Sequence, residues 1–529
     1  MDYIYRWQAD ISYVVRDLAA RGYQTNVCGG VMPPHKLPRS LFKIALCQVE
    51  ALVNTSCKNI ETTYGTYNEN GCQEQIAMLQ GYLLSNIPGM VLDEVCEERK
   101  IGIKQDFRIR LAVYMHPTMR KFSVSNRPVD IKFDFDDSFW IEHLSKLHHL
   151  IVLDLHLVCT DEILEVIGNN CSKLEQINIV SKIEPVHTMK DTQETFNALK
   201  LKFFVSDAGL YHLCKCKLLK KVTMNKILRS QYGGRMMTLA GIRNLVKSLP
   251  YLQNITYDDM GLVISEEMED IDRLSLTHLN DYHPNPTHIA AAAQLCYNLQ
   301  HLCLQFPNQT SICSALDILE CLACSELQVS ILELIQFPFG IEMVRLLENK
   351  GMFLRSLLVH TTDYFNSRIM HIIAQSCPNL KNLHLKQLLG DKDNSSSIEL
   401  CTPNRVEHMF QNLHCLYLGG RDWNPVELLP LCLLHARQLE TLTLMQMHFQ
   451  GSLDDVFAHI TSMNPLKELK AVHMFTGRVI TITTIQYFFK HCPELSFLQT
   501  SNITAQDVKN LHDEVYKNNL DLKNLFNEY

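Results

Sequence analysis

The chain has 529 residues, of which 46% are hydrophobic and 20% are charged, and its formal net charge is −8. This composition is that of a folded protein and excludes a disordered or fibrous chain. The length predicts several domains or one elongated repeat array, and the mild negative charge leads us to expect no nucleic-acid partner.

The sequence also bears on the compartment in which the protein works. No apolar run reaches the ~18–20 residues that a membrane-spanning helix needs, so we expect no membrane partner. Residues 1–7 lack the basic and then apolar order of a signal peptide. We therefore expect the protein in the cytoplasm, the nucleus or both, with its 19 cysteines mostly present as reduced thiols.

Residues 1–105 do not follow the repeat that fills the rest of the chain, and we expect two units there. The first unit, residues 1–36, is expected to hold an amphipathic helix and then a linker, because a glycine pair and a proline pair break the chain. The second unit, residues 37–105, is expected to be a helical module that docks a partner or caps the repeats.

Two helix starts organise the second unit. A proline, which is favoured in the first turn of a helix, precedes a predicted helix at residues 40–53. On that helix Leu41 and Ala45 lie one turn apart, on a face suited to a partner's groove. A polar loop is expected over residues 54–71, and Ile87-Pro88 begins another predicted helix.

From residue 106 onward one pattern recurs, in which a helix-like segment, often ending in cysteine, precedes leucine-x-x-leucine-x-leucine. The clear copies begin at Leu150, Leu174, Leu219, Leu252, Leu299, Leu327, Leu354, Leu380, Leu413, Leu439, Leu466 and Leu495. Weaker copies begin at Met119, Phe196 and Ile271, and the Leu327 copy is irregular. A period of 26–29 residues with this strand signature is typical of leucine-rich repeats.

Each repeat is expected to form a short strand and an outer helix, because alternate leucines face inward and the helical segments have one apolar face. One such unit cannot bury its apolar face alone, so neighbouring units must stack. The predicted fold class is therefore α/β: a leucine-rich-repeat solenoid over residues 106–529, with a parallel inner sheet and outer helices, after the small helical module. Residues 504–529 are expected to form a polar-faced closing helix.

The residues between the buried leucines should point into the concavity of the solenoid, where a stiff backbone suits the binding of a protein substrate. Aromatic side chains with polar neighbours favour protein recognition. The residues that we expect to contact this partner are His301, His360, Asn382, His384, Tyr417, Thr443, Lys470 and Phe497.

The sequence contains no phosphate-loop, dinucleotide-binding, zinc-protease or serine-hydrolase motif, so we expect no enzyme, no catalytic residue and no cofactor. The cysteine pairs at 214–216 and 321–324 are expected to pack as small apolar side chains, since zinc would need a second pair nearby. Prolines within 278–288 break any helix that would align its histidines on a metal. The acidic run at 257–270 is expected to be solvated.

The repeats resemble the cysteine-containing leucine-rich repeats of F-box and related adaptor proteins. Ser40, Leu41, Ala45 and Val49 resemble the elongin-binding box of the von Hippel–Lindau type, S/T-L-x-x-x-C/S/A-x-x-x-apolar. In the similar Zyg-11-like receptors a loop, a helix that starts with apolar-proline (here Ile87-Pro88) and leucine-rich repeats follow this box. The chain departs from that pattern in having alanine in place of the commoner cysteine, no clear cullin-selecting box and no armadillo half.

This resemblance implies a non-catalytic substrate receptor of a cullin-RING ubiquitin ligase. The four box residues would bind an elongin B/C-type adaptor, which brings a cullin, and the repeats would hold a protein substrate. Two alternatives stay open. An F-box starting at Leu37-Pro38 or Ile87-Pro88 would bind a Skp-type adaptor, and a general repeat scaffold would have no ligase link.

Overall fold

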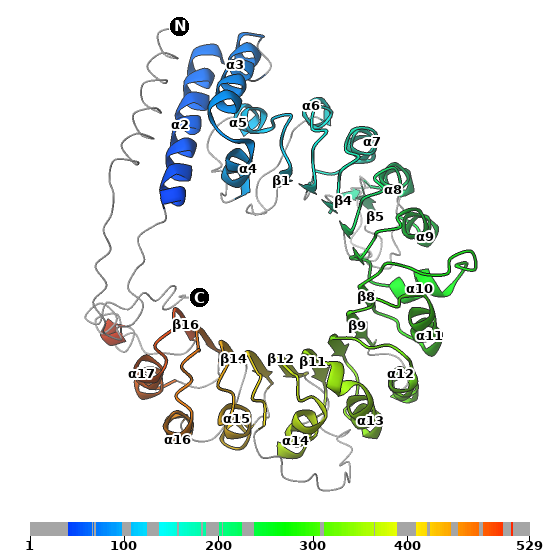
Figure 1. Cartoon of the computed structure of the whole chain (residues 1–529), viewed down its shortest axis with the longest axis vertical. Helices are drawn as coiled ribbons and strands as arrows, with labels where there is room; N and C mark the ends of the chain where they lie inside the picture. The colour runs from blue at the N-terminus through cyan, green and yellow to red at the C-terminus, as the bar shows by residue number, and fades with distance from the viewer. Residues whose placement is uncertain are drawn as a thin grey trace, which may run out of the picture.

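The protein is a curved array of repeats in which strands line the inner side and helices line the outer side (Figure 1). The computed structural model describes residues 41–65, 67, 70–97, 107–123, 137–155, 158–180, 183–186, 200–203, 205–224, 237–306, 312–363, 365–388, 409–420, 424–445, 453–475, 480–500 and 509–511. No helix in these ranges is both long and apolar enough to cross a bilayer. The predicted unit 1–36 lies outside them, as does the predicted closing helix apart from residues 509–511.

An α-helical module forms the N-terminal end of the array. It consists of α2 (Leu41–Tyr64), α3 (Asn70–Asn86), α4 (Gly89–Glu97) and α5 (Phe107–Tyr114). The loop expected over residues 54–71 is wrong, because α2 continues to Tyr64 and α3 begins at Asn70. The polar side chains of this stretch belong to the outer face of α2, while Cys57 and Ile60 are buried on its inner face.

The module covers the first strand of the solenoid, β1 (Lys121–Ser123). Asp93 of α4 accepts a hydrogen bond from the backbone N–H of Arg120 at 3.3 Å. Because the edge strand of a sheet otherwise exposes unpaired backbone groups and apolar surface, α4 acts as a cap on the array.

Gln80 of α3 holds the end of α5. Its Nε2 donates to the carbonyl oxygens of Ala112, in the last turn of α5, at 2.6 Å and of Met115, just after α5, at 2.8 Å. Since α5 packs against both α2 and α3, the helical part of the chain extends to Tyr114, beyond the expected boundary at residue 105.

The solenoid strands form two parallel sheets, with the orders β1-β2-β3-β6-β7 and β16 through β8. The first sheet continues from β1 with β2 (Val152–Asp154), β3 (Gln176–Asn178), β6 (Lys221–Thr223) and β7 (Asn254–Ile255). The second contains β8 (His278–Asp281), β9 (His301–Gln305), β10 (Ile331–Ile335), β11 (Ser356–Thr361), β12 (Asn382–Gln387), β13 (Cys415–Gly419), β14 (Thr441–Met445), β15 (Ala471–Phe475) and β16 (Phe497–Thr500).

Helices and one short 3-10 turn cover the outer side of these sheets (Figure 1). They are α6 (Asp137–Leu144), α7 (Asp161–Asn170), α8 (Asp207–Leu213), α9 (Leu239–Ser248), α10 (Met260–Ser265), α11 (Pro286–Leu295), α12 (Ile312–Cys324), α13 (Ile341–Lys350), η2 (Gly351–Phe353), α14 (Ser367–Ser376), α15 (Pro425–Leu433), α16 (Asp454–Met463) and α17 (Ile482–His491). The predicted α/β solenoid of parallel strands and outer helices is confirmed.

One backbone ladder joins the two sheets into a single solenoid. In each repeat the carbonyl oxygen just after the first leucine accepts two N–H groups from the next repeat. At the break between the sheets, Gln253 accepts from Thr277 at 2.8 Å and from His278 at 3.2 Å. The ladder positions are Arg120, Ile151, Glu175, Lys220, Gln253, Thr277, Gln300, Ser330, Arg355, Lys381, His414, Glu440, Lys470 and Ser496.

This ladder corrects the predicted register of three repeats. The residue immediately before each ladder position is a buried apolar residue, so Leu276, Val329 and Leu469 take the places expected for Ile271, Leu327 and Leu466. In the last of these repeats, Leu466 and Leu469 are three residues apart and fit the pattern equally well in sequence. The backbone conformation distinguishes them. Leu466 has φ 45° and lies in the turn before the strand, so it is not the anchor.

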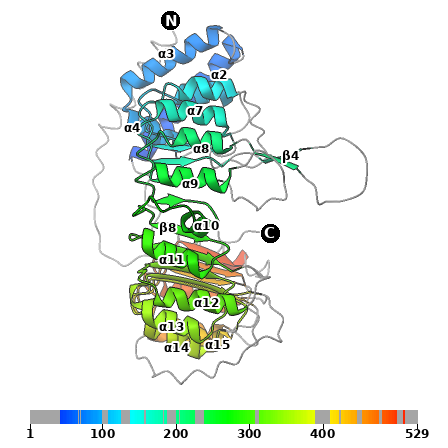
Figure 2. The ribbon, with the colours of Figure 1, turned by 90° about the vertical axis from the view of Figure 1, so that its right-hand side faces the viewer.

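The weak copy expected at Phe196, a residue outside the described ranges, contributes no strand to the solenoid sheet. β4 (Ile183–Val186) and β5 (Lys200–Phe203) form an antiparallel two-stranded sheet that extends away from the solenoid (Figure 2). Because β3 pairs directly with β6 in the solenoid sheet, and α8 is the outer helix between them, the two-stranded sheet is an insertion in one repeat. Alternating apolar residues occur in any half-exposed strand, which is why β5 resembles a repeat.

The recurring cysteine closes the outer helix of its repeat. Cys171, Cys296, Cys377 and Cys492 each directly follow a helix and donate a backbone N–H to a carbonyl in its last turn. All four side chains are buried. A small apolar thiol therefore fills the space where the chain turns from helix to strand.

Candidate functional site

The strands β8–β16 place every second side chain on the concave face of the sheet. The middle row on this face, read across the strands in register, is Asn280, Cys303, Glu333, Leu358, His384, Tyr417, Thr443, His473 and Gln499. This row carries Glu333, His384, Tyr417 and His473, and His278, His301 and His360 lie two residues away from it on the same face. It is held by a continuous parallel ladder, so its positions are fixed before any partner binds.

Six of the concave side chains, which we call the histidine cluster, form two groups of three that make contacts across neighbouring strands, and His360 of one group lowers the pKa of Glu333 in the other. They are His278, His301, Glu333, His360, His384 and Tyr417. On one side, the rings of His278 and His301 have centroids 5.3 Å apart, and Nε2 of His301 lies 2.9 Å from Oε1 of Glu333.

The other side of the cluster is aromatic. Nε2 of His360 lies 3.1 Å from Nε2 of His384, so one ring must be unprotonated at this atom in order to accept. The ring of His384 stacks on Tyr417 with centroids 3.6 Å apart and an interplanar angle of 19°. These contacts form a half-buried aromatic platform at the centre of the concave face.

Burial and local hydrogen bonds set the charge of the cluster. The hydrogen bond from His301 lowers the pKa of Glu333, against its partial burial, which raises it. Burial lowers the pKa of His384 to about 4 and also lowers that of His360. At neutral pH the cluster therefore holds an ionised Glu333 on one side and the neutral rings of His360 and His384 on the other, which suits recognition of polar and aromatic groups on a protein.

Metal binding and thiol reactivity are two other kinds of chemistry that the described residues bear on. Among them, no three His, Cys, Asp or Glu side chains are grouped so that they could hold a metal ion. Burial raises the pKa of Cys216 to about 11 and that of Cys377 to about 12, so these thiols stay protonated. The expected packing of the cysteine pair at 321–324 is only partly right, because Cys321 is half-buried but Cys324 is exposed.

The predicted concave residues lie on the strands as expected, with one exception. His301, His360, Asn382, His384, Tyr417, Thr443 and Phe497 are on the inner strands. Lys470 instead precedes β15, on the edge ladder, where its Nζ lies 3.0 Å from Oε2 of Glu440. The wrong anchor at Leu466 caused this error, and the register of β15 gives the concave position to His473.

Register also explains the concave residues that the sequence reasoning missed. Glu333 lies in the repeat whose anchor is Val329, two residues after the expected Leu327. His278 follows the misplaced anchor at Ile271. A search for apolar residues at both +3 and +5 from each anchor would have found Val329 and Leu469, since both positions are buried in each case.

The predicted adaptor-binding residues lie at the beginning of α2. Ser40 lies outside the described residues, as do the side chains of Leu41 and Ala45, whose backbones form the first turns of the helix. Val49 is half-buried and packs against the core of the helical module. Their role in binding stays a prediction.

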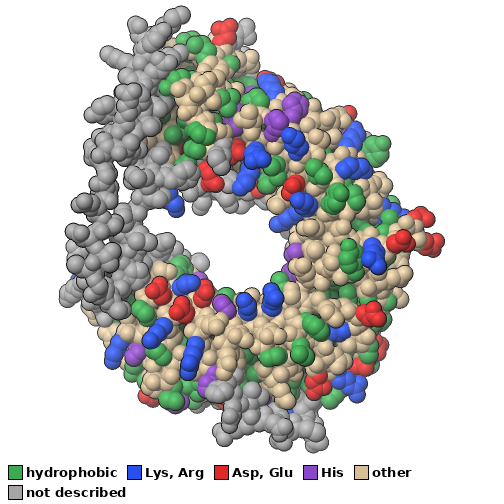
Figure 3. All heavy atoms as spheres, viewed as in Figure 1, with side chains coloured by type: hydrophobic (Ala, Val, Ile, Leu, Met, Phe, Trp, Pro, Cys, Tyr) green, Lys and Arg blue, Asp and Glu red, His purple; other side chains and the backbone are tan. Residues whose placement is uncertain are grey.

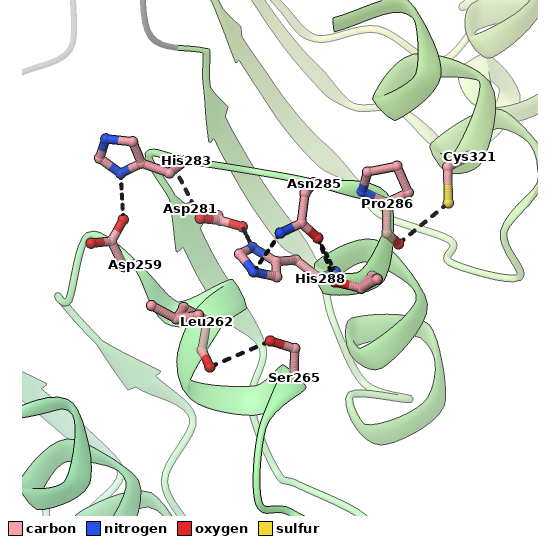
Figure 4. A network of polar contacts seen from close by, with 10 residues as sticks. Asp259, Leu262, Ser265, Asp281, His283, Asn285, Pro286, His288 and Cys321 are labelled. Carbon is pink, nitrogen blue, oxygen red and sulfur yellow. Dashed lines mark hydrogen bonds and ion pairs between the residues drawn. The ribbon is translucent and has the colours of Figure 1, made fainter. Parts of the chain in front are cut away.

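A second polar cluster lies inside the solenoid where the two sheets meet (Figure 4). Asp281 takes the third leucine position of its repeat and has an exposed fraction of 0%. Nδ1 of His288 lies 2.7 Å from Oδ2 of Asp281, and Nδ2 of Asn285 donates to Nε2 of His288 at 2.9 Å. Because Nε2 accepts, Nδ1 carries the proton and donates to Asp281.

The cluster extends to the turn before α10. The backbone N–H of His283 donates to Oδ1 of Asp281 at 3.2 Å, and Nδ1 of His283 lies 2.7 Å from Oδ1 of Asp259. Asp259 is buried, so the acidic run at 257–270 is not simply solvated as expected. We assign this cluster a structural role, because its groups bind one another and tie α10, β8 and α11 together.

The rest of the acidic run also has a defined partner. Glu266 and Glu267 lie 3.1 Å and 2.6 Å from the guanidinium of Arg243, whose side chain is 7% exposed. A buried guanidinium needs such carboxylates to offset its desolvation. These two glutamates therefore pair with Arg243 of α9 within the chain, and they are not a free surface for a basic partner protein.

Charge is unevenly distributed along the inner rim of the solenoid (Figure 3). Lys and Arg side chains stand above β11 and β12, whereas Asp and Glu gather above β14–β16. Glu440, Glu468 and Glu494 all act on Lys470 and raise its pKa, the hydrogen bond to Glu440 most. A basic and an acidic part of the rim thus lie next to each other.

Comparisons with known proteins bear on the fold. No protein-family model and no curated protein matches the chain. Fifty-eight chains of solved structures do. One of them, from the crystal structure of the Rad7 and Elc1 complex in yeast, is 11% identical, with 89% of this chain and 96% of that chain covered and a TM-score of 0.40. A likeness with a TM-score this low carries no conclusion about this chain. The chain is thus identified as a leucine-rich-repeat solenoid by its own order of parallel strands and outer helices.

Proposed function

We propose that the protein is a non-catalytic substrate receptor. Its concave face would hold a protein substrate, and the start of α2 would attach it to an elongin B/C-type adaptor of a cullin-RING ubiquitin ligase. Transfer of ubiquitin would then follow from proximity, which requires no catalytic group in this chain.

The observation that carries the substrate-binding half is the histidine cluster on a rigid sheet. Its side chains already contact one another at fixed distances, such as 2.9 Å between His301 and Glu333, so little conformational entropy is lost when a partner binds. Aromatic side chains such as Tyr417 supply large contact areas at low entropic cost and are enriched where binding energy concentrates.

The adaptor-binding half rests on the placement of the box residues. Leu41, Ala45 and Val49 lie in the first part of a 24-residue helix. This helix is anchored further along, where Val53, Cys57 and Ile60 are buried against the rest of the module. A helix held in this way presents its first turns at a fixed angle, as groove-binding helices require. Because α4 caps β1 independently, the capping of the array and the docking of an adaptor are compatible.

A pulldown with purified elongin B/C tests this proposal. Leu41→Glu should abolish recovery of the adaptor, because a carboxylate cannot enter an apolar groove without a large desolvation cost. Thr63→Glu is the matched control, since it adds the same charge to an exposed position of α2 about 33 Å further along the helix. It should bind like the wild type, and both variants should melt at the wild-type temperature.

Three outcomes distinguish the alternatives. Equal recovery by Leu41→Glu and wild type would contradict the role of the box. Recovery of a Skp-type adaptor in place of elongin would favour an F-box in the helical module. Recovery of neither adaptor would leave a repeat scaffold without a ligase link.

A further inference from the structure

A cavity of about 570 Å³ opens at the edge of the solenoid, outside the histidine cluster, where the helix-to-strand turns of three consecutive repeats meet. It is lined by Met352, Phe353, Arg355, Asn379, Lys381 and Asn412. Nothing in the function proposed above uses these residues, and their combination of apolar and basic side chains is unlike that of the concave face.

The apolar part of the cavity consists of two large side chains, Met352 and Phe353, that are exposed to solvent. Met352 and Phe353 in η2 are 65% and 43% exposed, although the residues on either side, Gly351 and Leu354, are buried. Gly351 also fixes this turn, because a Cβ at this position would lie 2.3 Å from the carbonyl oxygen of Ser376. The protein therefore presents adjacent apolar side chains in a fixed turn.

The basic part of the cavity is formed by Arg355 and Lys381, which are successive positions of the edge ladder. The N–H of Lys381 donates to the carbonyl of Arg355 at 2.8 Å, which brings the two cationic residues side by side. Among the described residues, no carboxylate lies within ion-pair distance of either side chain. Neighbouring like charges on adjacent strands are unfavourable unless a counter-charge is supplied.

At two other steps of the same edge ladder, a lysine is paired with a carboxylate of the preceding repeat. Lys220 lies 2.8 Å from Glu175, and Lys470 lies 3.0 Å from Glu440, in each case across one step of the ladder. At the corresponding step, Lys381 faces the cation Arg355. The site thus lacks the carboxylate that equivalent positions have within the chain.

The walls of the cavity are fixed by hydrogen bonds to the turns. Nδ2 of Asn379 donates to the carbonyl of Met352 at 2.9 Å, and Nδ2 of Asn412 donates to that of Pro378 at 3.1 Å. Each amide joins one repeat to the preceding one. The cavity is therefore preorganised, which lowers the cost of binding a ligand.

We propose that this cavity binds a short acidic and apolar segment of a partner protein. A carboxylate of the segment would lie between Arg355 and Lys381, and a neighbouring apolar side chain would cover Met352 and Phe353. A long polyanion such as nucleic acid fits the surface less well, because acidic side chains gather on the adjacent part of the rim, above β14–β16 (Figure 3).

The test is selection of a phage-displayed random octapeptide library on the full chain, with the double variant Arg355→Glu/Lys381→Glu in excess as a soluble competitor. The competitor removes peptides that bind elsewhere, including on the concave face. The expected survivors carry Asp or Glu next to Phe, Leu or Met. Synthetic versions should bind the double variant at least tenfold more weakly in fluorescence polarisation, and replacing Asp and Glu by Asn and Gln should cause a similar loss.

Lys467→Glu is the matched control, because Lys467 is exposed on the same edge but outside the cavity. It should bind the peptides like the wild type. A second variant, Met352→Ser/Phe353→Ser, should also weaken binding without changing the melting temperature. Survivors without acidic residues, no survivors at all, or equal affinity for the double variant would overturn the proposal. If no peptide were recovered and a fluorescent oligothymidine bound the wild type but not the double variant, the cavity would instead bind nucleic acid, and the proposal would be wrong.

Discussion

The carboxylate of Asp281 and the imidazole of His288 form a buried pair, with Oδ2 and Nδ1 2.7 Å apart, at a position where the repeat otherwise places a leucine. The pair lies at the break between the five-stranded and nine-stranded sheets. Here β7 has only two residues, so it forms fewer backbone hydrogen bonds with its neighbouring strands than the longer strands do. Polar contacts between side chains replace part of the missing backbone pairing.

This pair should stabilise the fold only as long as both partners are present. Asp281→Ala leaves the N–H of His288 buried without an acceptor and should lower the free energy of unfolding by about 3 kcal/mol. The double variant Asp281→Leu/His288→Leu should be less destabilised than the sum of its single variants, because it removes both polar groups together. Chemical denaturation of the four proteins measures this coupling. Additive effects would contradict it.

Gly261 is required for the same pair to form. A Cβ at this position would lie 2.0 Å from Oδ2 of Asp281 and 2.6 Å from Nδ1 of His288. Gly261→Ala should therefore lower the melting temperature clearly. Gly81→Ala is the control, because a Cβ there meets nothing within 4 Å on α3, and alanine in a helix stabilises by about 0.5–1 kcal/mol. A Gly261→Ala protein as stable as the wild type would contradict the close approach.

The cysteines should differ sharply in reactivity. Burial raises the pKa of Cys377 and that of Cys492 to about 12, so neither forms the reactive thiolate at neutral pH. Cys313 and Cys324 are exposed. Brief treatment of the native protein with iodoacetamide, followed by peptide mass spectrometry, should modify the exposed pair and spare the buried pair. In denaturant all four should react, and equal labelling in the native protein would count against their burial.

Stability should fall as the pH is lowered from about 6.5 to about 4. Burial lowers the pKa of His384 to about 4, below the usual value for an unfolded chain. In this window the unfolded chain binds a proton that the folded chain does not, so protonation favours unfolding. The melting temperature should therefore be lower at pH 5 than at pH 7.

Variants on β12 test whether His384 is a source of this loss of stability at low pH. His384→Gln should show a smaller loss of stability between pH 7 and pH 5 than the wild type, because this proton uptake is removed. Asn382→Gln, at an exposed position on the same strand, should keep the wild-type dependence. An unchanged slope in His384→Gln would exclude His384 as a source of the effect.

The repeat made the solenoid predictable, because each copy repeats the same buried positions at a near-constant period. Register was less predictable where apolar residues stand three apart, as Leu466 and Leu469 do, since the choice between them depends on backbone pairing with the next strand. β5 has the alternating apolar sequence of a repeat strand but pairs antiparallel with β4 instead of joining the parallel solenoid sheet.

How well the residues of the concave face could be predicted depended on the register of each repeat. His301, His384 and Tyr417 could be assigned to the concave face because their repeats are regular. The contacts among them depend on pairing across strands, which no single repeat specifies. The cavity at Arg355 and Lys381 could not be predicted either, because it forms between turns of separate repeats.

The most direct test of the central claim, that the concave face holds a protein partner, is photo-crosslinking in cells. p-Benzoylphenylalanine would replace Tyr417 on the concave face and, in a matched protein, Tyr211, which is 62% exposed on the outer helix α8. The proposed function predicts a discrete crosslinked protein at position 417 that is absent at position 211. No adduct at 417, or the same adducts at both positions, would contradict it.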